Sequence, residues 1–302
     1  MLENSLKTER PARRSLWKIT GWRILDAWRN ALLPNRCAVC GNWVPAIDTP
    51  HLISGSIGSG AGDCAGNAAA NQCGSALPAA LLAAGLSNLA TILCDSCRQQ
   101  VVTVQRPLCT VCGRMFEDRE GSDRRCGDCT RQPRYFASAR SAVLYISGFR
   151  KVVHQFKYRG KTRLAGPFGD ILLGTFLRFW GSDDMDLILP VPLHPKRFRQ
   201  RGFNQACLLM ANWNRLDARL AATPRLLVRT RATAPQTGLG KAERRRNIRR
   251  AFDVKRPESV RSRRILLVDD VYTTGATVNE CARVLMHCGA RRVDVLTLAR
   301  AV

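Results

Sequence analysis

One segment, residues 265–277, constrains the fold more than any other part of the sequence. It begins with four consecutive branched apolar residues, which is typical of a strand buried on both faces in a parallel sheet. Asp269 and Asp270 follow where this strand is expected to end, and a Thr/Gly loop then leads into a helix expected from about Ala276. Ligands of open α/β sheets bind at the carboxyl ends of the strands, where helix N-termini offer free N–H groups to phosphate. The segment therefore predicts an α/β fold with a site at this edge.

A second interpretation of the same segment is a buried strand that ends in two solvated aspartates. Adjacent side chains of a strand point to opposite faces, so one of the two carboxylates would then face the core. A buried carboxylate without a partner is costly. We therefore favour a ligand-binding role, in which the acids hold ribose hydroxyls or a metal ion and the Thr/Gly loop wraps a phosphate.

The chain is strongly basic, with 48 Lys and Arg against 23 Asp and Glu and a formal net charge of +25. Such a field favours anionic partners, namely phosphates, nucleic acid or an acidic protein. An arginine-rich chain is also what a GC-rich coding sequence produces, so both explanations of the charge stay open. The first residues carry mixed charge and no apolar signal core, so we expect a cytoplasmic protein without a transmembrane segment. Its thirteen cysteines are then expected to be reduced or metal-bound.

Eight of the cysteines form four pairs that share a two-residue gap. These pairs are Cys37/Cys40, Cys94/Cys97, Cys109/Cys112 and Cys126/Cys129. Two such knuckles complete one tetrahedral site of four thiolates, so the sequence predicts two structural zinc ions. Sequential pairing of neighbouring knuckles is the simplest arrangement, and a cross-braced arrangement is the alternative. A thioredoxin-type redox pair is disfavoured because the spacing occurs four times.

The sequence divides into three expected regions: an N-terminal extension with a helix (residues 1–36), a double zinc ribbon (37–133) and an α/β domain (134–302). Residues 42–93 separate the first two knuckles and are rich in Ala, Gly, Ser and Asn, which predicts a low-complexity insertion at the tip of a ribbon. Ala76 to Leu93 is uncharged and long enough to be considered as a membrane-spanning helix. A span there would put two knuckles of one metal site on opposite sides of the bilayer, so we reject it.

The α/β domain contains two further cationic segments. The loop expected at 194–205 carries Arg197, Arg199 and Arg201 ahead of a helix expected at 206–216, an arrangement that suits a pyrophosphate. A solvated charged loop is the plainer alternative. Arg229 and Arg231 begin a Thr-, Gly- and Pro-rich segment that is expected to be a mobile flap over a phosphorylated substrate.

An arginine cluster follows the expected flap, from Arg244 to Arg250. It fits two roles, because the same cations could close over a phosphorylated substrate or form a nucleic-acid patch. Residues 276–288 and 292–298 then complete the expected fold as a helix and a strand, with Gly289 as the helix stop.

The chain resembles the ComF (competence protein F) family. Three features carry the resemblance: the Leu-Leu-Pro run before Cys37 with the four knuckles, the Arg-Gly-Phe-Asn-Gln run at 201–205, and the 229–231, 246–247 and 269–277 segments. The last of these resembles the phosphoribosyl pyrophosphate (PRPP) signature of type I phosphoribosyltransferases. Residues 42–93 depart from the family, because the ribbon loop there is usually short.

The resemblance implies a type I phosphoribosyltransferase-like parallel sheet flanked by helices and preceded by a small double zinc ribbon. It implies that Asp269 and Asp270 take the ribose hydroxyls, directly or through Mg²⁺. The 5′-phosphate would then be bound by the loop residues Thr273, Thr274, Gly275, Ala276 and Thr277. Purine-salvage members carry an acid where Thr273 stands here, so no general base and no catalytic residue is identified.

Two function classes remain open, both linked by the resemblance to DNA uptake or the use of external DNA. One is a phosphoribosyltransferase that acts on PRPP and an unidentified acceptor. The other is a non-catalytic adaptor that keeps the pocket for PRPP or a nucleoside 5′-phosphate and engages single-stranded DNA or competence proteins.

Overall fold

The computed structural model describes residues 36–44, 70–118, 120–158, 160–215, 217–218, 222–233 and 240–302. The helix expected before Pro34 and most of the expected flap lie outside these residues. The division of the chain at residue 134 stays a prediction.

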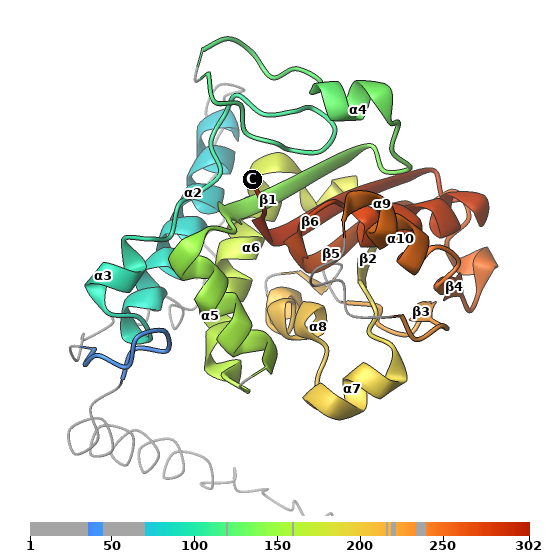
Figure 1. The fold of residues 1–302 in the computed structure, drawn as a ribbon. Helices are drawn as coiled ribbons and strands as arrows, with labels where there is room; N and C mark the ends of the chain where they lie inside the picture. The colour runs from blue at the N-terminus through green and yellow to red at the C-terminus, as the bar shows by residue number, and fades with distance from the viewer. Residues whose placement is uncertain are drawn as a thin grey trace, which may run out of the picture.

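A parallel sheet forms the centre of the described structure, with its strands in the order β1–β6–β5–β2 (Figure 1). The four strands are β1 (Ser138–Leu144), β2 (Leu187–Pro190), β5 (Arg264–Tyr272) and β6 (Arg292–Arg300). Apolar side chains fill both faces, because β5 and β6 are central and covered on each side. In register, Leu267 lies opposite Val295 and Leu189. The predicted α/β class is therefore confirmed.

Four helices cover one face of the sheet. They are α5 (Ser147–Tyr158), α6 (Ala165–Phe179), α8 (Gln205–Leu209) and, packed behind α6, α2 (Ala70–Asn88). Phe156, Phe168 and Phe176 are fully buried there against Leu266 and Leu296 of the sheet. We call this side the α6 face.

The segment expected to be a low-complexity insertion contributes α2 to this core, which the sequence analysis did not predict. Leu82 and Leu86 pack against the α6-face core, and two glycines let α2 and α6 touch. A Cβ on Gly85 would lie 2.6 Å from the Ile171 backbone nitrogen, and one on Gly174 would lie 2.5 Å from that of Leu82. The Ala- and Gly-rich composition that resembles a linker is thus also one that permits close helix packing.

The opposite side, called here the α10 face, is covered by α10 (Ala276–His287), α9 (Lys241–Ile248) and a two-stranded antiparallel sheet of β3 (Leu227–Arg229) and β4 (Phe252–Val254). Val278, Cys281 and Leu285 of α10 pack on Ile265 and Val295 of the sheet. The predicted helix after residue 276 and the last strand are confirmed.

The cationic segment expected to be a loop is instead a short helix, α7 (Pro195–Arg201). His194 caps it through Nδ1, which accepts a hydrogen bond from Lys196 N, and Gly202 ends it. Asn204 then caps α8, so the helix expected at 206–216 begins one residue earlier and ends at Leu209. The expected loop is wrong because His194 and Pro195 form a helix start, which decides the local structure despite the charge density.

The two ribbons lie on different sides of the sheet (Figure 1). Helix α3 (Asp95–Arg98) belongs to the first ribbon and lies beside α5, and α4 (Gly127–Arg131) belongs to the second and lies above the sheet. Among the described residues, no helix is long and apolar enough to cross a membrane.

Candidate functional site

Two acids at the carboxyl edge of β5 face opposite sides of the sheet. Asp270 points toward α5, where its Oδ1 lies 2.8 Å from Lys157 Nζ. Asp269 faces the α10 side, where its charge acts on Cys281 and Arg229. Lys157 was not singled out from the sequence. It directly follows Phe156, which belongs to the buried apolar stripe of the helix. That position at the edge of a buried stripe was the available signal.

Electrostatics at this edge depend on the acid pair and the lysine together. Burial and the neighbouring Asp270 carboxylate raise the pKa of Asp269 to about 7. Burial lowers the pKa of Lys157, but Asp270 more than offsets this, so the pKa lies above its usual range. The site therefore holds a charged ion pair next to a carboxyl group that titrates near neutral pH.

The Thr/Gly loop turns sharply between β5 and α10. Gly275 adopts a φ of +73°, a left-handed conformation that favours glycine, and its carbonyl accepts the first hydrogen bond of α10 from Asn279 N. Thr274 Oγ1 accepts a hydrogen bond from Ala276 N at 3.3 Å. The partly exposed Thr273 and Thr277 side chains flank this turn at the N-terminus of a twelve-residue helix. Such a turn presents amides and hydroxyls to an anion.

Two of the predicted cationic residues come together beside Asp269. Arg197 donates a hydrogen bond to the Thr233 carbonyl at 3.2 Å, and the buried Arg229 donates to the hydroxyl of the same threonine. Burial and the proximity of Arg197 lower the pKa of Arg229 to about 10. Arg229 Nε is buried without a hydrogen-bond partner among the described residues. Two neighbouring cations, of which Arg229 has an unused donor, are suited to a polyanion.

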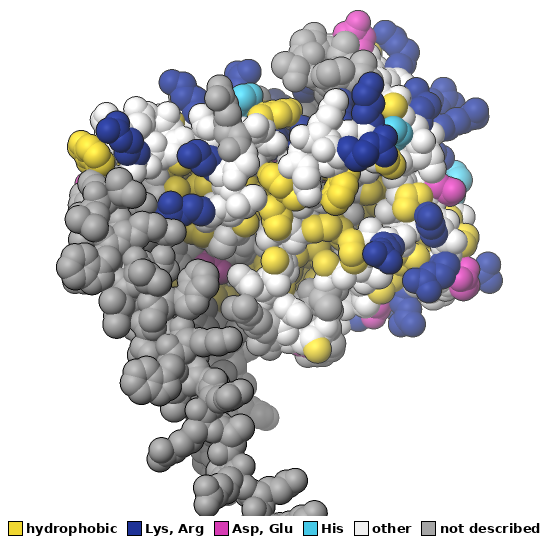
Figure 2. Space-filling view, turned by 90° about the horizontal axis from the view of Figure 1, so that it is seen from below, with side chains coloured by type: hydrophobic (Ala, Val, Ile, Leu, Met, Phe, Trp, Pro, Cys, Tyr) yellow, Lys and Arg dark blue, Asp and Glu magenta, His cyan; other side chains and the backbone are white. Residues whose placement is uncertain are grey.

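The other three cationic candidates make different contacts. Arg201 stacks over the exposed ring of Tyr158 at 4.6 Å and donates to Gln205 Oε1, while Arg199 is exposed. Arg231 donates to the carbonyls of Asn247 and Arg249 at the end of α9. Seen from below, apolar side chains gather across the middle of this side of the molecule, and Lys and Arg side chains lie along its edges (Figure 2).

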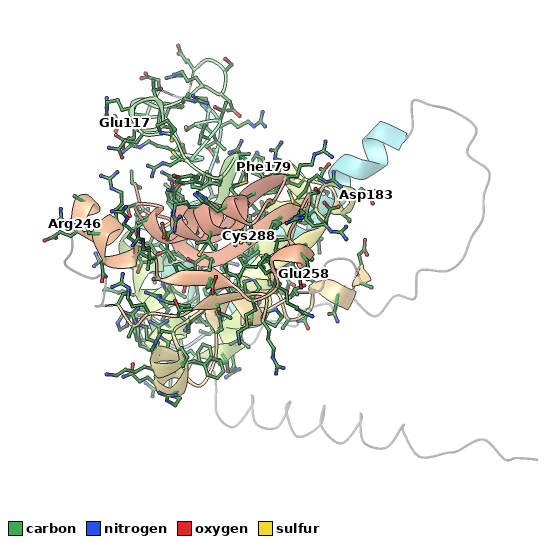
Figure 3. All side chains as sticks on the ribbon, turned by 90° about the vertical axis from the view of Figure 1, so that its right-hand side faces the viewer. Glu117, Phe179, Asp183, Arg246, Glu258 and Cys288 are labelled. Atoms are coloured by element: carbon green, nitrogen blue, oxygen red, sulfur yellow. The ribbon has the colours of Figure 1, made fainter. Side chains whose placement is uncertain are left out.

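The arginines of α9 form a separate basic surface. Arg245 and Arg246 are exposed, and Figure 3 shows Arg246 pointing away from the body of the domain. Glu280 of α10 accepts a hydrogen bond from Arg250 N and pairs with Arg283, which anchors the end of this cluster to the domain. Arg245 and Arg246 therefore face solvent.

The eight knuckle cysteines form two groups of four, in the predicted sequential pairing. The first cluster consists of Cys37, Cys40, Cys94 and Cys97, and the second of Cys109, Cys112, Cys126 and Cys129; within each, the sulfur atoms lie within 4.8 Å of one another. Sulfur separations of 3.5 Å (Cys40–Cys94) and 3.7 Å (Cys112–Cys126) match the edge of about 3.8 Å that Zn–S bonds of 2.3 Å give in a tetrahedron. Both clusters fit structural zinc with every ligand position filled.

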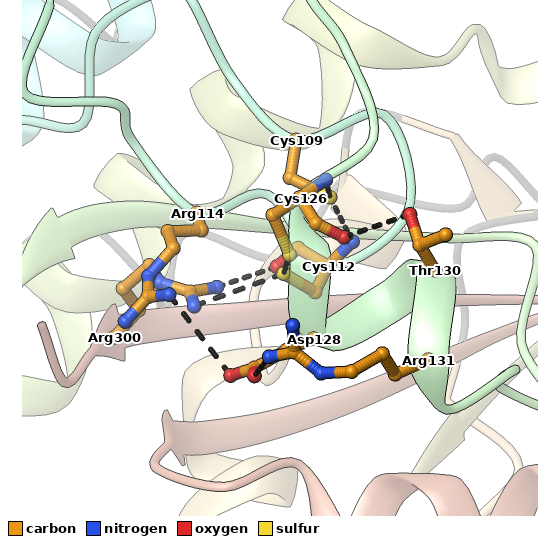
Figure 4. A network of polar contacts seen from close by, with 8 residues as sticks. All are labelled: Cys109, Cys112, Arg114, Cys126, Asp128, Thr130, Arg131 and Arg300. Carbon is orange, nitrogen blue, oxygen red and sulfur yellow. Dashed lines mark hydrogen bonds and ion pairs between the residues drawn. The ribbon is translucent and has the colours of Figure 1, made fainter.

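The surroundings of the two clusters differ. The first cluster packs on the α6 face and leaves Cys40 exposed, whereas all four cysteines of the second are buried on the α10 face. Cys109 Sγ accepts hydrogen bonds from the amides of Cys112 and Cys126, which is typical of a metal knuckle. Arg300 reaches the second cluster from the end of β6 (Figure 4).

A cavity of about 500 Å³ lies at the opposite, amino-terminal edge of the sheet. Four arginines line it, and three are ion-paired: Arg106 with Asp123 at 3.6 Å, Arg264 with Asp186 at 3.3 Å, and Arg292 with Asp294 at 2.6 Å. Asp184 also lines the cavity, and Asp183 lies at the same corner of the domain as Phe179 (Figure 3). Because carboxylates balance most of these cations, we assign no ligand to this cavity.

Comparison with known proteins supports the zinc ribbon and finds relatives that cover most of the chain. Residues 85–130 match the double zinc ribbon domain family, a stretch that begins within the 42–93 insertion and leaves out the first knuckle. The DNA utilization protein YhgH of Escherichia coli strain K12 is 32% identical over 225 residues, which is 69% of this chain and 96% of that protein.

Two competence proteins are similar at a comparable level. Competence protein F of Haemophilus influenzae is 30% identical, over 69% of this chain and 90% of its own length. Competence protein ComFC of Bacillus subtilis is 30% identical, over 69% of this chain and 84% of its own. Fold and cysteine clusters define a double zinc ribbon joined to an α/β domain with a parallel sheet flanked by helices. The chain belongs to the ComF family of competence proteins.

Proposed function

We propose that the carboxyl edge of the sheet binds PRPP or a nucleoside 5′-phosphate together with Mg²⁺, in a protein that serves DNA uptake or utilization. The observation that carries the proposal is the meeting, at one edge, of the acid pair, the loop of residues 273–277 and the Arg197–Arg229 pair. The names of the relatives support the DNA-related role.

Each part of this edge matches one part of the ligand. Asp269 and Asp270 hold the ribose hydroxyls, directly or through Mg²⁺, for which carboxylate oxygens are suitable ligands. Amides and hydroxyls of Thr273 to Thr277 hold the 5′-phosphate at the start of α10. Arg197 and Arg229 neutralise the pyrophosphate, and Lys157 holds Asp270 in place through their ion pair.

As a phosphoribosyltransferase, the protein would position the ribose so that an acceptor forms a bond to C1 while the bond from C1 to the pyrophosphate oxygen breaks. The electron pair leaves with pyrophosphate, whose charge is stabilised by the arginine pair. The acceptor must arrive with its lone pair available, because Thr273 stands where a carboxylate base would be needed.

Calorimetry with PRPP and Mg²⁺ tests the pocket. The wild type is expected to bind, whereas Asp269→Asn combined with Asp270→Asn abolishes binding and leaves the fold intact by circular dichroism. Glu117→Gln is the matched control, because Glu117 is an exposed acid on the second ribbon, away from the sheet (Figure 3). Equal affinity of the wild type and the double variant would overturn the assignment. Release of pyrophosphate with candidate acceptors separates the transferase from a binding protein.

We propose, as the second candidate function, a non-catalytic adaptor that binds single-stranded DNA. The α9 arginines supply phosphate contacts, and the Tyr158–Arg201 stack together with the exposed Phe198 supplies rings on which bases can stack. Tyr158→Ala should weaken binding of an oligonucleotide without changing the affinity for PRPP. No binding of single-stranded DNA at low salt would remove this candidate. The expected cytoplasmic location stays a prediction.

A further inference from the structure

Tyr272 joins the loop of residues 273–277, called here the phosphate loop after its proposed ligand, to the interior of the α10 face. Its ring is buried against Phe136, with ring centroids 6.4 Å apart, and its hydroxyl has no hydrogen-bond partner among the described residues. A Cβ on Gly275 would overlap this hydroxyl and the adjoining ring carbons. The loop therefore rests directly on the Tyr272 ring, and a shift of the ring must move the turn.

Arg300 lies on the other side of this ring. It is the register partner of Tyr272 in β6, and its guanidinium carbon lies 4.9 Å from the ring centroid. The same guanidinium donates to the Cys112 carbonyl and lies 3.9 Å from Cys112 Sγ (Figure 4). Cys112, Arg300, Tyr272 and Gly275 thus form a continuous line of contacts from the second cluster to the phosphate loop.

The charge of Arg300 ties this line of contacts to the zinc-loaded second cluster. Arg300 is buried, and among the described residues no carboxylate lies within ion-pair distance of it. Four thiolates around Zn²⁺ carry a net charge of −2, which is the counter-charge that this arginine faces. When the metal leaves, nothing holds the four sulfur atoms of this cluster together, so Cys112 can move and Arg300 can leave its place against the Tyr272 ring.

We infer that Arg300 and Tyr272 are positioning residues that couple metal occupancy of the second cluster to the conformation of the phosphate loop. This inference rests on the proposed function only for the identity of the ligand. Because binding linkage is reciprocal, PRPP must raise the zinc affinity of the second cluster by the same factor by which zinc raises the affinity for PRPP. Linkage of this kind usually amounts to about fivefold or more.

The first cluster provides an internal control. It lies on the other face, where Gly148 and Lys151 at the start of α5 border Cys40 and Cys97. Among the described residues, its cysteines form hydrogen bonds with one another and with Gly41, Asn42, Ser96 and Arg98, and none of these bonds reaches the phosphate loop. Metal loss from this cluster is therefore expected to leave the loop unchanged.

Zinc release to a chromogenic chelator tests the coupling in the full-length chain. Cys94→Ser should retain zinc in the second cluster, and PRPP with Mg²⁺ is expected to slow its release at least about fivefold. Cys126→Ser should retain zinc in the first cluster, and PRPP is expected not to alter its release. Adding Arg300→Gln to Cys94→Ser leaves the four ligands in place and should bring the PRPP effect close to one. Equal PRPP effects on both clusters, or an unchanged effect in the Arg300→Gln variant, would overturn the inference.

A second measurement needs no ligand and therefore separates this inference from the proposed function. Cys94→Ser holds zinc only in the second cluster, and removal of that zinc is expected to accelerate hydrogen–deuterium exchange of residues 272–278. Cys126→Ser holds zinc only in the first cluster, and removal of that zinc is expected to leave this exchange unchanged. Tyr272→Leu should produce the faster exchange even with zinc bound. If PRPP fails to bind the wild type, the proposed function is wrong and this exchange still decides the coupling. Unchanged exchange on loss of the second zinc would contradict it.

Discussion

The two cysteine clusters have the same four ligands and the same knuckle spacing, yet they lie in different surroundings. The first packs on the α6 face with one exposed cysteine, and its two knuckles are separated by a long insertion. The second is entirely buried on the α10 face and contacts Arg300 of β6, the strand that pairs with the one leading into the loop of residues 273–277. Ligand chemistry alone therefore does not define the role of a zinc ribbon; the surface on which it packs does.

Loss of one zinc ligand in each cluster should show the largest difference between the two faces. Cys109→Ser removes a ligand from the buried cluster, and we expect it to lower the free energy of unfolding by about 4 kcal/mol or more. Cys94→Ser should cost less, because the first cluster is partly exposed. Denaturant unfolding with metal analysis of each variant measures this. An equal loss in both variants would show that burial of the cluster does not matter.

The Lys157–Asp270 pair tests the acid on the α6 face. Lys157→Met leaves a buried carboxylate without its partner, and we expect a loss of about 3 kcal/mol in unfolding free energy together with weaker PRPP binding. Adding Asp270→Asn removes the unpaired charge and should restore much of the stability without restoring binding. A double variant that is no more stable than Lys157→Met would contradict the ion pair.

Close packing of α2 on α6 tests the inserted helix. Gly85→Val places a side chain against the Ile171 backbone and should destabilise the protein by about 1–3 kcal/mol. The zinc content of the second cluster is expected to stay unchanged, because that cluster lies on the other face. Thermal unfolding shows the first effect and metal analysis the second. A neutral Gly85→Val would show that the insertion is not part of the core.

Asp269 tests the acid on the α10 face through pH. Its pKa is raised from 3.8 to about 7, so the folded protein favours the protonated form. The associated stabilisation is present below about pH 4 and is lost as the pH rises through about 7. The unfolding temperature of Asp269→Asn should therefore exceed that of the wild type at pH 8 and differ little from it at pH 4. A difference that is independent of pH would contradict the raised pKa.

The α9 arginines should show the smallest effect on the domain itself. Replacing Arg244, Arg245 and Arg246 with Ala is expected to leave stability and PRPP affinity unchanged. The same replacement should reduce the slope of log affinity for single-stranded DNA against log salt concentration by up to about two units. Each phosphate that is no longer neutralised accounts for about 0.7 of this change. Competition by PRPP for the remaining binding would show that the DNA crosses the phosphate loop.

How far the sequence predicts this molecule depends on whether the signal is local. The apolar run before Asp269 and the repeated knuckle spacing are local patterns, and they predicted the buried strand, the helix after it and the two metal clusters. Helix α2 was missed because its Ala- and Gly-rich composition has two interpretations, and only contact with α6 decides between them. Arg300 was missed because its partner Cys112 lies 188 residues away, in a contact that no spacing encodes.

The candidate site shows the same division. The sequence places the acids and the Thr/Gly loop on one segment, but it does not show which of five arginines reaches them. Burial and the contact with Thr233 select Arg197 and Arg229, while Arg231 is held by the end of α9. Lys157 joins the site from a helix more than a hundred residues away in the sequence, and only the fold reveals that approach.

The affinity for PRPP in the presence of Mg²⁺, measured by calorimetry on Cys94→Ser and Cys126→Ser side by side, tests the difference between the clusters most directly. Both variants keep one intact cluster and every residue of the carboxyl edge. We predict that Cys94→Ser binds as the wild type does and that Cys126→Ser binds at least about fivefold more weakly. Equal affinities of the two variants would contradict the account.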